Sequence, residues 1–117
     1  MTKAIVPKTV LVYQDKEGRE PFAEWFQGLR DAEGKARIET RLQRVAAGLY
    51  GDWASVGQGV KELRMLFGPG YRVYFGEDGE NIVLLLCAGD KRTQKDDIKT
   101  AQGYWKEYKS HGEETNL

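Results

Sequence analysis

The sequence has very few of the residues on which common functional sites depend. It has one cysteine, Cys87, and one histidine, His111, among 117 residues. A single thiol cannot form an internal disulfide, which fits a reducing compartment. One histidine and one cysteine do not make a typical metal site or histidine-based catalytic site, although a site built from carboxylates alone stays open. Cys87 lies within the apolar run Ile82–Ala88, so we expect a small buried side chain and not a nucleophile.

Other absences narrow the class of protein. The formal net charge is zero, so composition alone does not indicate a nucleic-acid partner. No stretch approaches the roughly 20 apolar residues of a membrane span, and Met1–Pro7 lacks the apolar stretch of a signal peptide. Gly68–Gly70 joins two expected strands and opens no helix, so it does not indicate a phosphate-binding loop. Ser55 and Ser110 lie in no recognisable nucleophile context. We expect a cytoplasmic protein.

The periodicity of apolar residues predicts a helical half near the N-terminus. A chain of this length is expected to form one domain over 1–117, with a core at about 8–109 and a polar, frayed tail at 110–117. Lys8–Gln14 is rich in β-formers. Two apolar stripes at helical spacing follow and predict an αα-hairpin packed on a sheet. The stripes are Phe22, Trp25, Phe26 and Leu29, then Ile38, Leu42, Val45, Ala46 and Leu49.

The second half predicts three strands and a last helix. Val60–Phe67 and Tyr71–Phe75 alternate between apolar and polar residues, and Ile82–Ala88 is apolar enough to be central and covered on both faces. Thr93 is expected to cap the last helix through a capping box with Asp96, and the glycine-rich connection before Val60 is expected to be irregular. The predicted class is α+β, in the order β-α-α-β-β-β-α with a mainly antiparallel sheet.

The same alternation brings basic residues to one face of the sheet. Glu62 and Arg64 should point away from Leu63, while Arg72 and Tyr74 should point away from Val73. If these strands pair, Arg64, Arg72 and Tyr74 share a face, and Lys91 and Arg92 follow the next strand. Taken singly, each residue has an ordinary interpretation, such as an ion pair between Arg64 and Glu62. Together they predict a cationic site.

The chemistry open to such a site is narrow. Cleaving RNA without a metal requires deprotonation of a 2′-OH, stabilisation of the charge on the phosphorane and protonation of the 5′-oxygen. Arginine suits the phosphate because its planar group donates two hydrogen bonds and keeps its charge. For proton transfer, the available candidate is a lysine or tyrosine whose pKa is depressed by neighbouring cations.

Three segments carry a resemblance to a known family. Gly59–Arg64, Gly68–Tyr74 and Gly89–Gln94, followed by Asp97, Ile98 and Ala101, closely resemble RelE/ParE superfamily toxins, and the nearest group is the HigB-like addiction module killer subfamily. Phe22–Phe26 with Leu29, and Gly48–Asp52, are similar to that subfamily's helical half. The resemblance runs over roughly residues 10 to 108 of the sequence.

The resemblance implies the toxin of a type II toxin–antitoxin pair. Many members are messenger-RNA endoribonucleases that act on the ribosome, need no metal or cofactor, and are silenced by a cognate antitoxin, here expected to be a helix-turn-helix protein encoded next to it. A membrane partner is not expected. The resemblance also implies an antiparallel sheet with two N-terminal helices packed on it. The implied catalytic residues are Arg64, Arg72, Tyr74 and Lys91, with Arg92, Lys95 and Lys61 as further RNA-binding residues.

Two alternatives come from the same resemblance. The superfamily also contains non-enzymatic, ParE-like inhibitors of DNA gyrase, and a toxin fold can persist as an inactive antitoxin-binding protein. The ribonuclease hypothesis therefore has a structural requirement. Arg64 and Arg72 must lie on the same side of the molecule and must not both be tied up in buried ion pairs.

Overall fold

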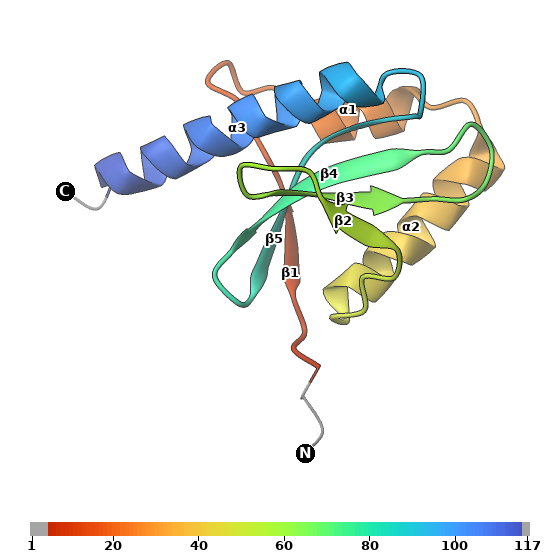
Figure 1. Cartoon of the computed structure of the whole chain (residues 1–117), viewed down its shortest axis with the longest axis horizontal. Helices are drawn as coiled ribbons and strands as arrows, with labels where there is room; N and C mark the ends of the chain where they lie inside the picture. Colours follow the sequence, from red (N-terminus) through yellow and green to blue (C-terminus); the bar gives the residue numbers. More distant parts are fainter. Residues whose placement is uncertain (1–4, 116–117) are drawn as a thin grey trace.

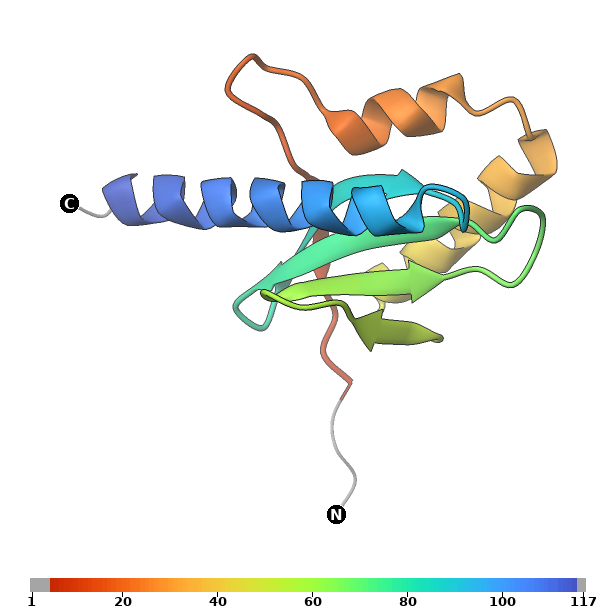
Figure 2. The same ribbon diagram turned by 45° about the horizontal axis from the view of Figure 1, so that its top comes forward.

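One five-stranded sheet, with helices on both faces, organises the chain (Figures 1 and 2). The computed structural model describes residues 5–115, with side chains described to residue 111. Residues 1–4 and 116–117 lie outside this range. The first group belongs to the segment predicted to lack a signal peptide, and the second to the end of the predicted tail. The elements are β1 (Thr9–Val12), α1 (Pro21–Gly28), α2 (Ala32–Ala46), β2 (Trp53–Ser55), β3 (Val60–Arg64), β4 (Arg72–Asp78), β5 (Ile82–Gly89) and α3 (Gln94–Thr115). Among the described residues, no helix combines the length and apolarity needed to cross a membrane.

The sheet is mainly antiparallel, as predicted. Its strand order is β1-β5-β4-β3-β2. β2, β3, β4 and β5 pair with their neighbours in antiparallel fashion, whereas β1 runs parallel to β5 at one edge. The predicted α+β class is confirmed, with its N-terminal pair of helices and C-terminal helix.

The two N-terminal helices cover one face of the sheet. α1 begins at Pro21, where the missing N–H costs little, and α2 begins after Asp31, whose side chain accepts a hydrogen bond from the Gly34 N–H at 2.9 Å. Ile38 and Val45 of α2 are fully buried against this face. The core on this side consists of Phe22, Ile38, Val45, Leu63, Met65, Tyr71, Val73, Phe75, Val83, Leu85 and Ala88.

α3 covers the opposite face. Ala101 and Trp105 of this helix pack on a second core that contains Tyr74, Leu84, Leu86 and Cys87. An irregularity in register explains how two adjacent residues of β5 reach it: Tyr74 pairs with Cys87, but Phe75 pairs with Leu85. Leu86 is therefore the extra residue of a β-bulge, and both Leu86 and Cys87 face α3. Burial raises the pKa of the Cys87 thiol to about 12, as expected for a packed side chain.

Three local predictions were wrong. The connection before β3 contains the short strand β2, which pairs with β3. α3 continues past the predicted start of the polar tail, to Thr115, because each added residue of an existing helix gains a hydrogen bond without needing burial. Thr93 does precede α3, but its hydroxyl donates to the carboxylate of Asp97, one residue beyond the expected capping partner Asp96.

Candidate functional site

Arg64 and Arg72 lie directly opposite each other, at the end of β3 and the start of β4. Both point away from the face covered by α1 and α2, as the alternation predicts. Arg72 also pairs with Gly89 at the end of β5, which brings the next turn close. The stem of Lys91 lies over Gly70, since a Cβ built on that glycine would be 3.1 Å from Lys91 Cγ and 3.6 Å from Arg72 Nη1. The structure therefore brings Arg64, Arg72 and Lys91 to one corner of the sheet.

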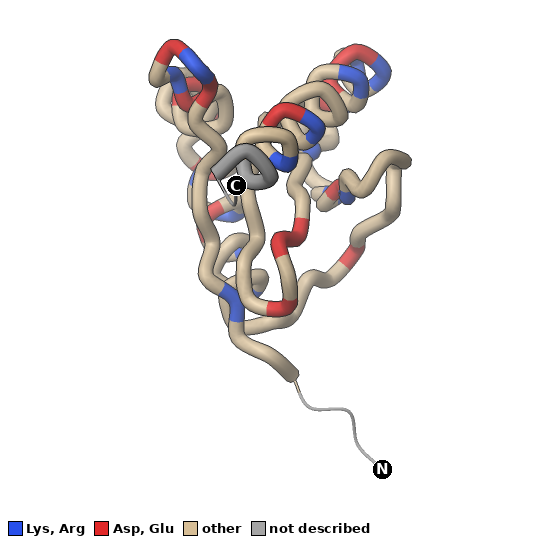
Figure 3. Tube along the Cα trace, turned by 90° about the vertical axis from the view of Figure 1, so that its left-hand side faces the viewer, with Lys and Arg blue, Asp and Glu red and all other residues tan. Residues whose placement is uncertain are grey.

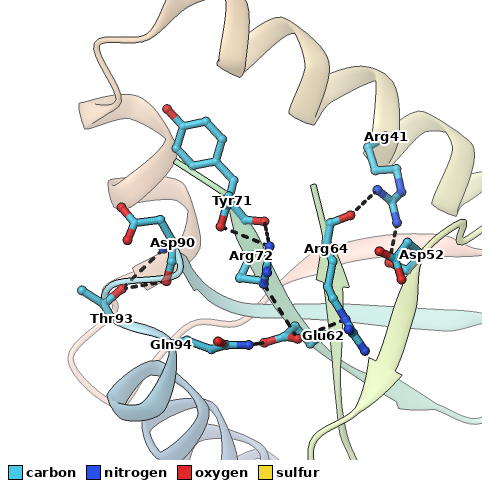
Figure 4. A network of polar contacts seen from close by, with 10 residues as sticks. Arg41, Asp52, Glu62, Arg64, Tyr71, Arg72, Asp90, Thr93 and Gln94 are labelled. Atoms are coloured by element: carbon cyan, nitrogen blue, oxygen red, sulfur yellow. Dashed lines mark hydrogen bonds and ion pairs between the residues drawn. The ribbon is translucent and has the colours of Figure 1, made fainter. Parts of the chain in front are cut away.

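A buried carboxylate sits at the centre of this corner. Glu62 is only 2% exposed. One of its oxygens, Oε1, lies 3.5 Å from Arg64 Nε and 3.9 Å from Arg72 Nε. The other accepts a hydrogen bond from Gln94 Nε2 at 2.8 Å (Figure 4). Glu62 thus joins β3, β4 and the start of α3 through charge and hydrogen bonding.

The two arginines differ in their access to solvent. The Arg72 side chain is 6% exposed, and its Nη1 donates to the carbonyls of Gly70 at 3.2 Å and Tyr71 at 3.1 Å. The Arg64 side chain is 40% exposed. Both Nε atoms are buried, and neither makes a hydrogen bond within the described part of the chain. The arginines meet the requirement of lying on one side. Arg72 is tied to a buried ion pair, but Arg64 keeps a surface from which to contact a ligand.

Tyr74 lies beneath this corner and not on its surface. The side chain is fully buried, and its hydroxyl makes no hydrogen bond within the described residues. Burial, followed by the negative charge of Glu62, raises the pKa of Tyr74 well above its usual value. The expectation that neighbouring cations would depress the pKa of a tyrosine here was wrong, because the charges that act on Tyr74 are acidic groups, Glu62 first among them.

The three further basic residues proposed for RNA binding lie in different surroundings. Arg92 is highly exposed and pairs with Asp90 at 3.1 Å, and this pair lowers the pKa of Asp90. Lys95 is exposed in the first turn of α3. Lys61 is ion-paired with Glu77 and lies 4.7 Å above the Trp53 ring, on the face opposite Arg64. The structure does not bring Lys61 into the group.

Two acids lie at this corner. The sequence already placed Glu62 on the face of Arg64 and offered an ion pair between them, which the structure contains, but the burial of Glu62 was not predicted. The place of Asp97 at this corner could not be predicted, because it depends on how α3 docks. Its carboxylate accepts from the Thr93 hydroxyl and lies against Gly89, and burial raises the pKa of Asp97. Such a carboxyl is better able to carry a proton near neutral pH than an exposed aspartate.

Arg41 fixes the position of the end of β3. Its guanidinium donates to three carbonyl oxygens, those of Tyr50 at 2.8 Å, Arg64 at 2.9 Å and Asp52 at 2.6 Å. Figure 4 shows this side chain reaching from α2 to the backbone of Arg64 and Asp52. The backbone from which Arg64 projects is therefore held by a charge-assisted bond to the neighbouring helix.

The cationic character of the corner is local. Figure 3 shows basic and acidic residues close together along the trace, without a long segment of one sign. Within residues 5–115 there is no cluster of three or more His, Cys, Asp or Glu side chains suited to a metal ion. What the corner offers chemically is the partly exposed guanidinium of Arg64, a neighbouring lysine, and a buried acid that orients Arg64 and Arg72.

Comparison with known proteins places the chain in a family. No family model matches the sequence. The chain is 44% identical over 81 residues to a protein of Haemophilus influenzae described as an uncharacterized protein, and the alignment covers 69% of this chain and 82% of that protein. The chain belongs to the same family as this Haemophilus influenzae protein.

Proposed function

We propose that the protein is the toxin of a type II toxin–antitoxin system, of the RelE/ParE superfamily and similar to its HigB-like addiction module killer group. In this proposal it works in the cytoplasm as a metal-independent, ribosome-associated messenger-RNA endonuclease that inhibits translation. The observation that carries the proposal is the convergence of Arg64, Arg72 and Lys91 at the corner where β3 and β5 end and β4 begins. It is supported by the resemblance of Gly59–Arg64, Gly68–Tyr74 and Gly89–Gln94 to those toxins.

The roles follow from exposure. Arg64 contacts the scissile phosphate and stabilises the charge that develops on it, because it is the arginine with an accessible guanidinium. Arg72 is buried and helps to position Arg64, because both arginines pair with the same Glu62 carboxylate. Lys91 supplies a further phosphate contact or transfers a proton. Asp97, with its raised pKa, is a second candidate for proton transfer.

Replacing Arg64 tests the proposal. Arg64→Ala removes the accessible guanidinium, and we expect cleavage of translated messages, measured by primer extension, to fall about 100-fold or more. Arg64 is preferred to Arg72 because its partly exposed side chain can be removed without stripping a fully buried group. Arg30→Ala, at an exposed arginine outside this corner, is the matched control and should cleave normally. Cleavage by Arg64→Ala at the rate of the unmodified protein would remove Arg64 from the mechanism.

A second candidate function is favoured by the state of the other residues. Arg72 is neutralised by Glu62 and the pKa of Tyr74 is raised, so these two residues supply no activated base. A non-enzymatic, ParE-like inhibitor of gyrase would use the same face only for binding. It would cause DNA-damage signalling in expressing cells while messages stay intact. An inactive toxin fold that only binds an antitoxin would allow expression without growth arrest.

The proposed partner is an antitoxin encoded by the neighbouring reading frame, expected to be a helix-turn-helix protein. Co-expression of that reading frame should restore growth and give a complex that purifies together. Growth arrest that persists under co-expression would contradict this part of the proposal.

A further inference from the structure

β1 forms one edge of the sheet and leaves its outer side open to another strand. Among the described strands it pairs with β5 alone (Figure 1). An edge strand presents a row of backbone N–H and C=O groups, and proteins usually protect such an edge with charged side chains. The stretch from Thr9 to Gln14 contains no charged residue. The outer side of β1, called the β1 edge below, therefore lacks this protection.

The hydrogen bonds toward β5 show which backbone groups of β1 point outward. The N–H groups of Thr9 and Tyr13 donate to backbone carbonyls on the β5 side, at 2.6 Å and 2.9 Å. In a parallel pair, successive residues alternate in the side to which their backbone groups point. Val10 and Val12 consequently direct both their N–H and their C=O groups away from β5, toward the β1 edge.

Leu11 lies between these two valines, and its side chain is 43% exposed. Val10 and Val12 are only partly buried against the core beneath α1 and α2. The opposite edge of the sheet differs, because β2 has three residues and lies between Gly51 and Gly57, both at positive φ. Short edge strands are themselves a protection against pairing. The β1 edge is therefore the edge better suited to pair with another strand.

We propose that two copies of this chain pair through their β1 edges, antiparallel, about a two-fold axis at Leu11. Val10 of each copy then lies opposite Val12 of the other, and the outward N–H and C=O groups of these valines pair with one another. Leu11 faces Leu11 of the second copy as a non-hydrogen-bonded pair, the type in which side chains lie closest. A contact of this kind uses the same surface on both copies and closes at a dimer.

Other registers of the two strands are less favourable. A shift by one residue places the outward groups of one strand opposite the inward groups of the other. A shift by two residues in one direction brings Lys8 opposite Lys16 of the second copy, and like charges directly opposite are destabilising. A shift by two in the other direction brings Val12 opposite Lys8, whose N–H already donates to the carbonyl of Ala46 at 2.7 Å. The register centred on Leu11 avoids these losses.

An identical strand suits this edge better than an unrelated one. The edge carries no charge with which to select an oppositely charged partner, whereas its outward groups are placed symmetrically about Leu11. The cationic corner lies elsewhere, because β1 pairs with β5 as far as Leu85, while Arg72 pairs with Gly89 at the end of β5. The inference therefore does not rest on the proposed function, and the dimer would present two such corners.

Sedimentation velocity of the full chain tests the inference at roughly 1 μM to 1 mM, the range of weak affinities. We expect the unmodified protein to shift from monomer to dimer as its concentration rises. Leu11→Lys and Leu11→Glu each place like charges face to face at the axis and remove the apolar contact, so each should raise the dimer Kd about tenfold or more. An equimolar mixture of these two variants places opposite charges there and should dimerise.

Leu66→Lys is the matched control, because it makes the same change at a leucine that is 87% exposed and lies outside β1. It should leave the dimer Kd within about twofold. Restored dimerisation in the mixture also shows that both Leu11 variants are folded.

Three results would overturn the inference: a protein that stays monomeric over this range, equal dimer Kd values for Leu11→Lys and Leu66→Lys, or a mixture that dimerises no better than its separate variants. Growth of assemblies beyond the dimer would also overturn it, because the proposed contact uses the β1 edge of both copies. The cleavage assay with Arg64→Ala decides the proposed function separately.

Discussion

At the scale of single residues, Glu62 decides what the cationic corner can do. It is nearly inaccessible, and its carboxylate faces the Nε atoms of two arginines. A buried charge is tolerated only when it is paired and hydrogen-bonded, and Arg72 and Gln94 provide this. Sequence reasoning placed the arginines on the correct face because β alternation is strict. It could not tell which arginine would be buried, because burial depends on the docking of α3 and the Lys91 turn.

Replacing Glu62 should therefore cost stability. Glu62→Gln leaves the buried Arg72 without its counter-ion, and removing one partner of a buried pair typically costs about 3–5 kcal/mol. The free energy of unfolding in urea measures this loss. Glu33→Gln breaks the exposed ion pair with Arg37 and should change the free energy of unfolding by less than about 1 kcal/mol. The double variant Glu62→Leu with Arg72→Leu should recover much of the loss; if it is less stable than Glu62→Gln, the pair is not the reason for the cost.

At the scale of elements, α3 docks on the sheet through a contact that requires a glycine. Gly76 of β4 is buried beneath the Trp105 ring, and a Cβ there would lie 2.3 Å from Trp105 Cε3. The sequence predicted the helix from the spacing of Ile98, Ala101, Trp105 and Tyr108 but not where it would lie. β2 was missed for a related reason. Its three residues are flanked by glycines and become a strand only through pairing with β3.

Substitution of Gly76 tests this docking. Gly76→Ala forces the Trp105 ring or the strand to move, and overpacking of this kind typically costs about 1–3 kcal/mol. Gly103→Ala is the control in α3, because nothing lies within 4 Å of its added methyl group. That change should stabilise the helix by up to about 1 kcal/mol. Thermal unfolding, monitored by circular dichroism, measures the stability of both variants. Equal changes in stability would mean that the Trp105 ring does not lie over Gly76.

At the scale of the whole molecule, tyrosine–carboxylate hydrogen bonds connect the layers. Tyr71 donates to Asp31 at 2.8 Å, and Tyr108 of α3 donates to Asp78 of β4 at 2.6 Å. Burial and then Asp31 raise the pKa of Tyr71 to about 12, and the bond to Asp78 followed by burial raises the pKa of Tyr108 to about 12. Tyr13 and Tyr50 make equivalent bonds to Glu107 and Glu77, and their pKa values are also raised.

These shifts predict an alkaline loss of stability. The folded-state pKa values lie above the ordinary value of about 10, so the folded state holds protons that the unfolded state releases. The stabilising contribution is complete below about pH 10 and falls as the pH rises through about 12. Urea unfolding at a series of pH values measures the slope. Tyr108→Phe should make the decline shallower, and stability that stays level from pH 10 to 12 would contradict the assignment.

The strand order has a consequence for synthesis of the chain. β1 is the first strand to be made, yet among the described strands it pairs with β5 alone, with Thr9 opposite Ile82. Pairing of these strands closes a long loop, which carries an entropic penalty. The first strand must therefore wait without its strand partner until residues 82–85 have left the ribosome. Completion of the sheet is thus timed by the last part of translation.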